Sequence, residues 1–383
     1  MSTFGERVRS TLNRVEDRIT DYRARMRTGR PWPAELELVA SFDDPMPTGV
    51  AVAKTGRVFL CHPRWGQPVS ATVVELRDGA RVPYPDLARN TAAGDADPHA
   101  FVSVQSVVVD ALDRLWVVDT GAPSFQPTTP GGPKLIRIDL ATDQVVQTIT
   151  FPAAVVLPTS YLNDVRIDPT RGAAGMAFLT DSSGTGPNGL VVVDLATGES
   201  WRRLHDHPST KALPRHDFWP ILDGRPLAAP LTIGCDGIAL AADRTRLYYC
   251  PLASRRLWSV AVDALVDRAR SDAAVAETVV DEGDKATGSD GLETDDKGNL
   301  YLTGYEQNAV LRRAPNGTLE TIAHDARLLW PDTLSVAADG YLYITANQLH
   351  RYPLFTGGED RRDKPRAWLF RVPIEAGPIS AVH

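Results

Sequence analysis

The stretch SDGLETDDKGNLYLTG, from Ser289 to Gly304, indicates the fold of the chain because its pattern recurs along the sequence. An Asp-Gly pair opens an alternating strand, and a polar turn leads to a second, apolar strand; this is the pattern of a β-hairpin. Six copies can be recognised, and they start at Thr48, Gln105, Asn163, Asp236, Asp290 and Asp332. A third strand follows most copies, as in LVVVDL, and several have a fourth, as in GTLETIA.

Six repeats of about fifty residues, each with four antiparallel strands, predict an all-β fold, a six-bladed β-propeller over residues 31–383. We expect AELELVASF, residues 34–42, to form the outermost strand of the sixth blade, so that both ends of the domain close the ring. The sequence after residue 30 has no helical pattern of useful length, which argues against a TIM barrel.

Residues 1–30 differ from the repeats and predict an amphipathic helix with a capping box at Thr3 and Glu6. Its apolar positions recur every three or four residues, and it is basic, with eight arginines against four acidic residues. Three roles stay open: docking on the rim of the propeller, pairing of two subunits in a homodimer, and binding of an acidic partner.

The composition of the 383-residue chain, 43% hydrophobic and 23% charged, is that of a globular protein. Its net charge of −7 argues against nucleic acid or an acidic membrane as a partner. No apolar run is long enough for a membrane span or a signal peptide, so we expect a cytoplasmic protein. Cys61, Cys235 and Cys250 form no disulfide framework, and we expect buried thiols.

The aspartates at the starts of the repeats point to a metal site. The first strand of every propeller blade lines the central channel, so equivalent positions form a ring there. Carboxylates that face one channel repel each other unless a cation compensates them, and calcium accepts irregular sets of oxygen ligands. We therefore expect a divalent metal, most simply calcium, at Asn163, Asp236, Asp290 and Asp332. The alternative is that each aspartate only caps its own turn.

The ends of the second strands lie at the same mouth and add candidates for catalysis. We expect Asp290 to move a proton, assisted by His62, Arg64 or Glu306; the alternative for Arg64, and for Trp65 beside it, is a structural loop anchor. The candidate ligand-binding residues are Gln105, Tyr161, Asp164, Trp330 and Asn347. Phe101 is a further aromatic candidate for the wall of the site. Stacking between blades explains the aromatic members equally well.

A long insertion, HDHPSTKALPRHDFWP, carries His205, His207 and His216. The spacing permits a metal site, but we favour a polar loop over the channel mouth, from which Asp217 to Trp219 reach a ligand. The sequence has no P-loop, no GxGxxG after a strand, no GxSxG and no HExxH, so we expect no nucleotide or redox cofactor.

Several motifs in order along residues 35–372 resemble the Yellow/major royal jelly protein family. They include PRWG at Pro63, DRLWVVDTG at Asp113, GLVVVDLATGESWRRL at Gly189 and YYCPLASRRLWSV at Tyr248. The resemblance implies a six-bladed propeller that holds small ligands, such as biogenic amines, in its channel, and a link to dopachrome tautomerisation. Without a secretion signal, the chain resembles a bacterial, intracellular branch of that family.

The channel strands LNDVRIDP, CDGIAL and SDGLETDDKGNLYLTG resemble a second family, the regucalcin/gluconolactonase lactone hydrolases. This resemblance implies that Asn163, Asp236 and Asp290 lie near a metal and that Asp290 serves as base. Where that family has a first-blade glutamate this chain has Thr48, and Asp332 is the candidate replacement. The expected function is metal-assisted hydrolysis of a lactone, or tautomerisation of a small polar or aromatic carbonyl compound. The alternative is a Yellow-type protein that binds a small ligand without turnover.

Overall fold

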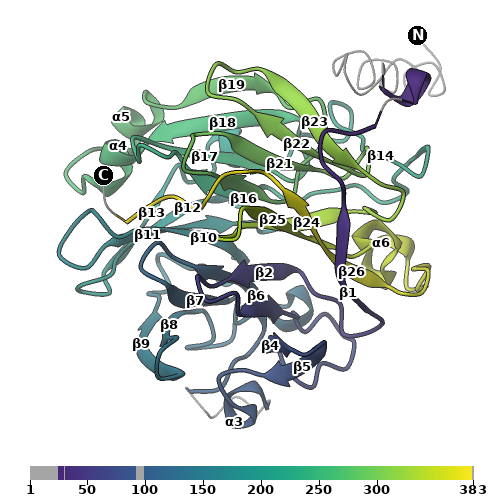
Figure 1. Cartoon of the computed structure of the whole chain (residues 1–383). Helices are drawn as coiled ribbons and strands as arrows, with labels where there is room; N and C mark the ends of the chain where they lie inside the picture. Colours follow the sequence, from purple (N-terminus) through teal and green to yellow (C-terminus); the bar gives the residue numbers. More distant parts are fainter. Residues whose placement is uncertain (1–24, 30, 92–98, 382–383) are drawn as a thin grey trace.

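Six four-stranded antiparallel sheets form a ring around a central channel (Figure 1). The computed structural model describes residues 25–29, 31–91 and 99–381. The predicted six-bladed β-propeller is confirmed, with one blade for every copy of the repeat. The predicted helix over residues 1–30 lies almost wholly outside the described residues and stays a prediction, as does the subunit pairing through it.

The strands of each blade follow one another along the chain from the channel outwards. Their bounds, from the first blade to the fifth, are β2 (Gly49–Val52), β3 (Val58–Cys61), β4 (Val73–Arg77), β5 (Ala80–Pro83); β6 (Val104–Val109), β7 (Arg114–Asp119), β8 (Lys134–Asp139), β9 (Gln144–Thr150); β10 (Leu162–Asp168), β11 (Met176–Asp181), β12 (Gly189–Asp194), β13 (Ser200–Arg203); β16 (Cys235–Leu240), β17 (Arg246–Pro251), β18 (Arg256–Ala261), β19 (Val280–Asp284); β20 (Leu292–Thr294), β21 (Leu300–Gly304), β22 (Ala309–Arg313) and β23 (Leu319–His324).

The sixth blade joins the two ends of the domain. Its strands are β24 (Pro331–Val336), β25 (Tyr341–Ala346), β26 (Ala367–Pro373) and, outermost, β1 (Glu37–Phe42). In Figure 1 the purple β1 runs beside β26, and Glu37 pairs with Arg371 across the ladder. The predicted closure by the segment 34–42 is therefore confirmed.

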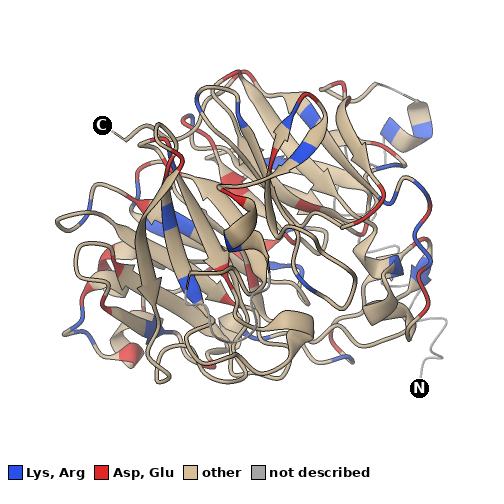
Figure 2. Ribbon diagram, turned by 90° about the horizontal axis from the view of Figure 1, so that it is seen from below, with Lys and Arg blue, Asp and Glu red and all other residues tan. Residues whose placement is uncertain are grey.

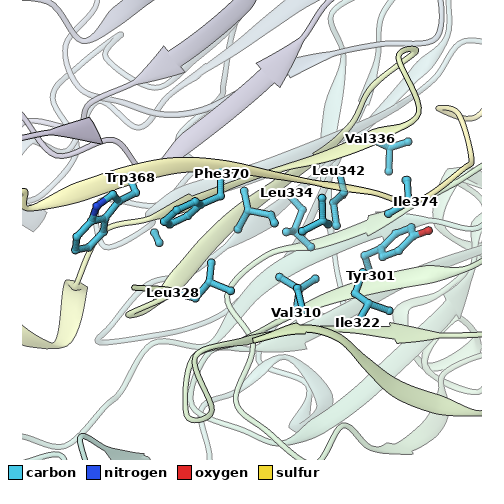
Figure 3. Close-up of a cluster of buried hydrophobic side chains, with 14 of the residues drawn as sticks. Tyr301, Val310, Ile322, Leu328, Leu334, Val336, Leu342, Trp368, Phe370 and Ile374 are labelled. Carbon is cyan, nitrogen blue, oxygen red and sulfur yellow. The ribbon is translucent and has the colours of Figure 1, made fainter. Parts of the chain in front are cut away.

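Apolar side chains of facing sheets fill the spaces between the blades. Figure 3 shows one such core, where Tyr301 and Val310 of the fifth blade pack against Leu334, Leu342 and Phe370 of the sixth. Alternation along each strand supplies these contacts, because every second side chain points to the same face of a sheet. Burial of such surface is the main source of stability for the ring.

Short elements fill the loops. They are α3 (Leu87–Asn90), η2 (Pro123–Phe125), η3 (Pro208–Thr210), the hairpin β14 (Ile221–Leu222) and β15 (Arg225–Pro226), α4 (Val262–Val266), α5 (Asp272–Ala276), η4 (Leu349–Arg351) and α6 (Pro353–Thr356). No helix in the described ranges is long and apolar enough to cross a membrane. The three cysteines are buried free thiols, as expected. Acidic and basic residues are interspersed over the blades (Figure 2).

Candidate functional site

The innermost strands begin at one mouth of the channel, and four of them are irregular at their candidate residue. The ladder register shifts between Val104 and Ser106 in β6, between Leu162 and Val165 in β10, between Cys235 and Ile238 in β16, and between Pro331 and Leu334 in β24. A bulge re-aims a side chain that regular pleating would send elsewhere. These four irregularities hold Gln105, Asn163 with Asp164, Asp236, and Asp332.

The glycine that follows two of the aspartates lets neighbouring inner strands approach closely. A Cβ atom on Gly237 would lie 2.3 Å from the Asp290 carbonyl oxygen, and one on Gly291 would lie 2.4 Å from that of Asp332. Real Cβ atoms do not come so near to backbone, so only glycine fits at these positions. The Asp-Gly pair thus places one carboxyl group beside the next around the channel.

The candidate residues at the starts of the inner strands, together with nearby loop residues, enclose a cavity of about 20 Å³, which is room for about one water molecule or ion. Polar groups form its inner part and apolar or aromatic groups its outer part. Its lining consists of Trp65, Gln105, Phe125, Tyr161, Asn163, Ser182, Ile233, Asp236, Leu252, Asp290, Asp332, Leu349 and Phe355.

Hydrogen bonds fix the polar groups of the cavity. The Asn163 amide nitrogen donates to Asp236 Oδ1 at 2.8 Å and to Ser182 Oγ at 3.0 Å. The indole of Trp330 donates to Asp290 Oδ2 at 2.7 Å. The carboxyl groups of Asp236 and Asp290 lie within hydrogen-bonding reach of each other, and because burial and the charge of Asp290 raise the pKa of Asp236, Asp236 is the group that can donate a proton to Asp290. The site is therefore a proton-sharing pair of carboxyl groups with an oriented amide beside it.

Burial is the main cause of the raised pKa values in this cluster. It raises the pKa of Asp290 to about 7, against the lowering effect of hydrogen bonds from Trp330 and Asp236. It also raises the pKa of Asp236 well above its usual value, and the charge of Asp290 adds to this. Burial and the charge of Asp290 likewise raise the pKa of Asp332, although the Asn347 amide donates to its Oδ2 at 2.5 Å. The cluster therefore holds protons at pH values where exposed aspartates have lost them.

Asp164 lies next to the cluster but is paired. It accepts hydrogen bonds from Ser106 at 2.7 Å and from Arg166 at 2.9 Å. The Arg166 guanidinium also reaches the fifth blade, where it donates to the Leu292 carbonyl oxygen at 2.5 Å and lies 3.5 Å from Glu293. Because Arg166 bridges two non-adjacent blades, it crosses the channel beneath the carboxyl cluster.

Aromatic rings wall the outer part of the cavity. Phe125 stacks on Tyr161 at 4.6 Å between ring centroids and on Trp65 at 5.1 Å. The Tyr161 hydroxyl donates to Gln105 Oε1 and accepts from the Trp65 indole, both at 2.8 Å. Trp330 stacks on Tyr305 at 4.3 Å behind Asp290. The expected aromatic wall thus includes two loop residues, Trp65 and Phe125, that sequence reasoning did not assign to it.

The other candidate residues lie outside the cavity lining. His62 is fully buried, and burial together with the charge of Arg81 lowers its pKa to about 3. Arg64 donates to the carbonyl oxygens of Asn90, Phe101 and Val102, which is the alternative role of a loop anchor.

Glu306 and Asn347 are likewise engaged in structural contacts. The Glu306 carboxylate pairs with Arg255 and accepts from the Gly288 backbone at 2.8 Å. Asn347 bridges Asp332 and the Pro47 carbonyl oxygen. Of these candidates, only Asn347 touches a residue of the cavity.

The long insertion contributes apolar rather than polar contacts at the channel mouth. Phe218 of the insertion joins a buried apolar cluster with Tyr305 and Trp330. Leu222 and Leu231, in the segment that follows the insertion, belong to the same cluster, and Ile233 of that segment reaches the cavity itself.

Its histidines are separate from one another. His205 contacts Arg202, His207 caps η3, and His216 pairs with Asp217 on the surface. No group of three or more His, Cys, Asp or Glu side chains suited to a metal ion occurs in residues 25–29, 31–91 or 99–381.

The donor chemistry of the cavity nevertheless fits a hard cation. Asn163, Asp236, Asp290 and Asp332 offer only oxygen ligands, with no thiolate or imidazole among them. As they are packed, Asp236 and Asp290 share a proton, which a divalent cation would have to displace. Thr48 offers no ligand, because its hydroxyl donates to the Gln105 carbonyl oxygen at 3.0 Å.

This geometry defines the class of the protein: a six-bladed propeller with a buried carboxyl cluster at one mouth of its channel. The family model described as major royal jelly protein matches residues 102–359, so the chain belongs to the major royal jelly protein family. Protein yellow of Drosophila subobscura is 29% identical over 268 residues, and that of Drosophila melanogaster is 25% identical over 280 residues. Both alignments cover 66% of this chain, which spans about half the length of these relatives.

Solved structures share the fold at low sequence identity. A regucalcin from Agrobacterium tumefaciens, described as a calcium-binding protein, has a TM-score of 0.56 at 14% identity and covers 91% of this chain and 97% of its own. A gluconolactonase from Xanthomonas campestris has a TM-score of 0.54 at 15% identity, with 89% of both chains covered. These similarities establish the architecture of the blades.

Proposed function

We propose that the chain is an enzyme that acts on a small carbonyl compound whose carbonyl group enters the channel cavity, with Asp290 as the acid/base group. The observation that carries this proposal is the pair of Asp236 and Asp290, within hydrogen-bonding reach of each other in a buried cavity. A buried carboxyl group with a pKa of about 7 can both take up and release a proton near neutral pH. Two candidate reactions need only these groups: tautomerisation of a carbonyl compound and hydrolysis of a lactone.

In a tautomerisation, the Asp290 carboxylate removes a proton from the carbon next to the carbonyl group. The C–H electrons form the new double bond, and the carbonyl oxygen takes the proton that Asp236 holds. Transfer of one proton between the two carboxyl groups then restores the pair. The amide of Asn163, bound to Asp236 at 2.8 Å, keeps that carboxyl group oriented throughout.

In a hydrolysis, Asp290 takes a proton from water while the water oxygen bonds to the lactone carbonyl carbon. The carbonyl oxygen accepts a hydrogen bond from Asp236 as it becomes negative. Collapse of the tetrahedral intermediate breaks the ring C–O bond, and the leaving oxygen takes a proton from the pair. Both reactions thus use the same two groups in the same protonation states.

The test is turnover of lactone and tautomerisable ketone substrates by the wild type, Asp290→Asn and a control, Glu199→Gln, whose carboxylate pairs with Arg268 on the surface. Loss of the base should lower kcat by about a hundredfold or more. The wild-type rate should rise with pH through about 7, since the base must be ionised. Equal rates in wild type and Asp290→Asn would refute the assignment of Asp290.

The same oxygen donors support a proposal for a cofactor. We propose that Asn163, Asp236, Asp290 and Asp332 hold calcium, which when bound would polarise a carbonyl oxygen. Calorimetry on chelator-treated protein should show binding that is lost in Asp236→Ala and in Asp290→Ala. Binding should release protons and strengthen as the pH rises, because the cation replaces the shared proton. Heats of binding that survive both substitutions would place the cation elsewhere.

Binding without turnover is a second candidate function. The stack of Trp65, Phe125 and Tyr161 over a carboxyl cluster suits an aromatic ligand with a polar or cationic group. Membership of the family that includes Protein yellow also favours it. Calorimetry would then show that an aromatic amine binds with no product formed, and Asp290→Asn would weaken its affinity.

A further inference from the structure

A groove lies on the surface directly outside the channel cavity. Its volume is about 430 Å³, and it runs between the loops around Phe125, Ser160, Thr185 and Leu231 and helix α6. The described residues that line it include no Asp, Glu, Lys or Arg, and most of them are apolar or proline. A hollow of this kind selects for a neutral, apolar group.

One layer of side chains separates the groove from the cavity. Phe125, Tyr161, Ile233 and Phe355 line both spaces. A molecule that lies in the groove therefore needs only to displace some of these four side chains to reach the carboxyl cluster.

Tyr161 is held by two hydrogen bonds, whereas the side chains of Phe125 and Phe355 make only apolar contacts, which an apolar ligand can replace. Ser124 and Phe125 both have positive φ angles, 54° and 55°, a conformation that costs energy for residues with a side chain. Phe355 belongs to the four-residue helix α6, which ends at Gly357 and Gly358 with φ angles of 79° and 103°. The opening between groove and cavity thus lies at Phe125 and Phe355.

The groove also extends away from the channel. A second hollow of about 610 Å³ shares Gly184, Thr185, Pro230, Leu231 and Thr232 with it. Lys211 of this hollow is paired with Asp206 at 3.0 Å, and Arg215, which also lines it, lies over the ring of Trp219, so the extension adds one positive charge at its far end. The combined space is far larger than the cavity and suits an elongated group.

We propose that the groove holds the outer part of the substrate, an elongated neutral alkyl or aryl group, while the carbonyl end passes between Phe125 and Phe355 into the cavity. This inference rests on the proposed function, because it names the substrate class for the same site. The substrates are then alkyl- or aryl-substituted carbonyl compounds rather than small sugars. Leu354, which is 51% exposed at the edge of the groove, gains an apolar partner when the substrate binds.

The experiment uses two ligand series with unbranched alkyl chains of increasing length: γ-lactones, and 1-alkanols that lack the carbonyl group. Calorimetry measures binding of both, and turnover is followed for the lactones. Each methylene that is buried should tighten binding by up to about fourfold, until the chain outgrows the groove. Leu354→Asp should flatten this dependence, and the matched control Leu87→Asp, 60% exposed on α3, should keep it.

The four outcomes separate the groove from the chemistry. Binding of both series that strengthens with chain length, together with lactone turnover, supports both proposals. Length-dependent binding without turnover supports the groove and overturns lactone hydrolysis as the reaction of this site. Lactone turnover with no dependence on chain length, in affinity or in KM, overturns the groove and leaves the function standing. If neither series binds and no lactone is turned over, the groove is refuted along with lactone hydrolysis.

Discussion

At the scale of single residues, the cavity depends on how each carboxyl group is held rather than on its presence. Asp164, Asp236, Asp290 and Asp332 start equivalent strands, yet they have different partners: an arginine, an amide, an indole and an amide. The donor from Trp330 stabilises the charged form of Asp290 and opposes the effect of burial on its pKa. Neutral donors thus keep the pKa of Asp290 at about 7, so that the carboxyl group can gain or lose a proton near neutral pH.

This balance predicts the effect of Trp330→Phe. Without the indole donor, the pKa of Asp290 should rise above 7, and the midpoint of its titration should move up by on the order of one pH unit. The phenyl ring keeps a partner for Tyr305, so the fold should persist. NMR of ¹³C-labelled carboxyl groups measures the midpoint, with Trp368→Phe as control in the core between the fifth and sixth blades. An unchanged or lower midpoint would show that the indole does not set this acidity.

At the scale of the elements, the sequence predicted the strands well and the loops poorly. Hairpins such as Ser289–Gly304 carry their own signal, because alternation and turn residues are local. The strand pattern of residues 34–42 is local too, while their place in the sixth blade, beside β26, followed from the closure of the ring. Local sequence does not determine which way a side chain points just beyond the second strand of a blade, since a one-residue difference turns that side chain to the other face. His62, Arg64 and Glu306 were therefore predicted at the mouth, while the structure engages them in other contacts.

The loops also hold what the sequence analysis missed. Trp65, Phe125, Ile233 and Phe355 complete the cavity, but they come from four separate loops whose meeting depends on the closed ring. The only local trace was Trp65 within the PRWG motif, where an anchoring role was considered. The insertion was expected to lie over the mouth as a polar loop, and its apolar residues make the contacts there instead. Apolar residues in a loop are a signal that it covers something.

At the scale of the whole molecule, ring closure forces buried acids together, and this has an energetic cost that depends on pH. In the folded protein the pKa values of Asp236, Asp290 and Asp332 lie above the value near 3.9 of an unfolded chain. The folded state therefore binds more protons than the unfolded state above about pH 4. The contribution of these groups to stability is greatest below that pH and is lost as the pH rises; for Asp290 the loss is complete somewhat above pH 7.

The double variant Asp236→Asn/Asp290→Asn isolates this cost. Between about pH 4 and 7 the free energy of unfolding of the wild type should fall, relative to the variant, by up to about 1.4 kcal/mol per pH unit for each extra proton bound. Urea unfolding at several pH values measures both proteins, and the difference removes the contributions of titrating groups that do not interact with this pair. Calcium, if it replaces the shared proton, should stabilise the wild type at neutral pH but not the variant. Parallel stability curves would mean that the cluster is ionised without cost, and that the fold compensates these carboxylates in another way.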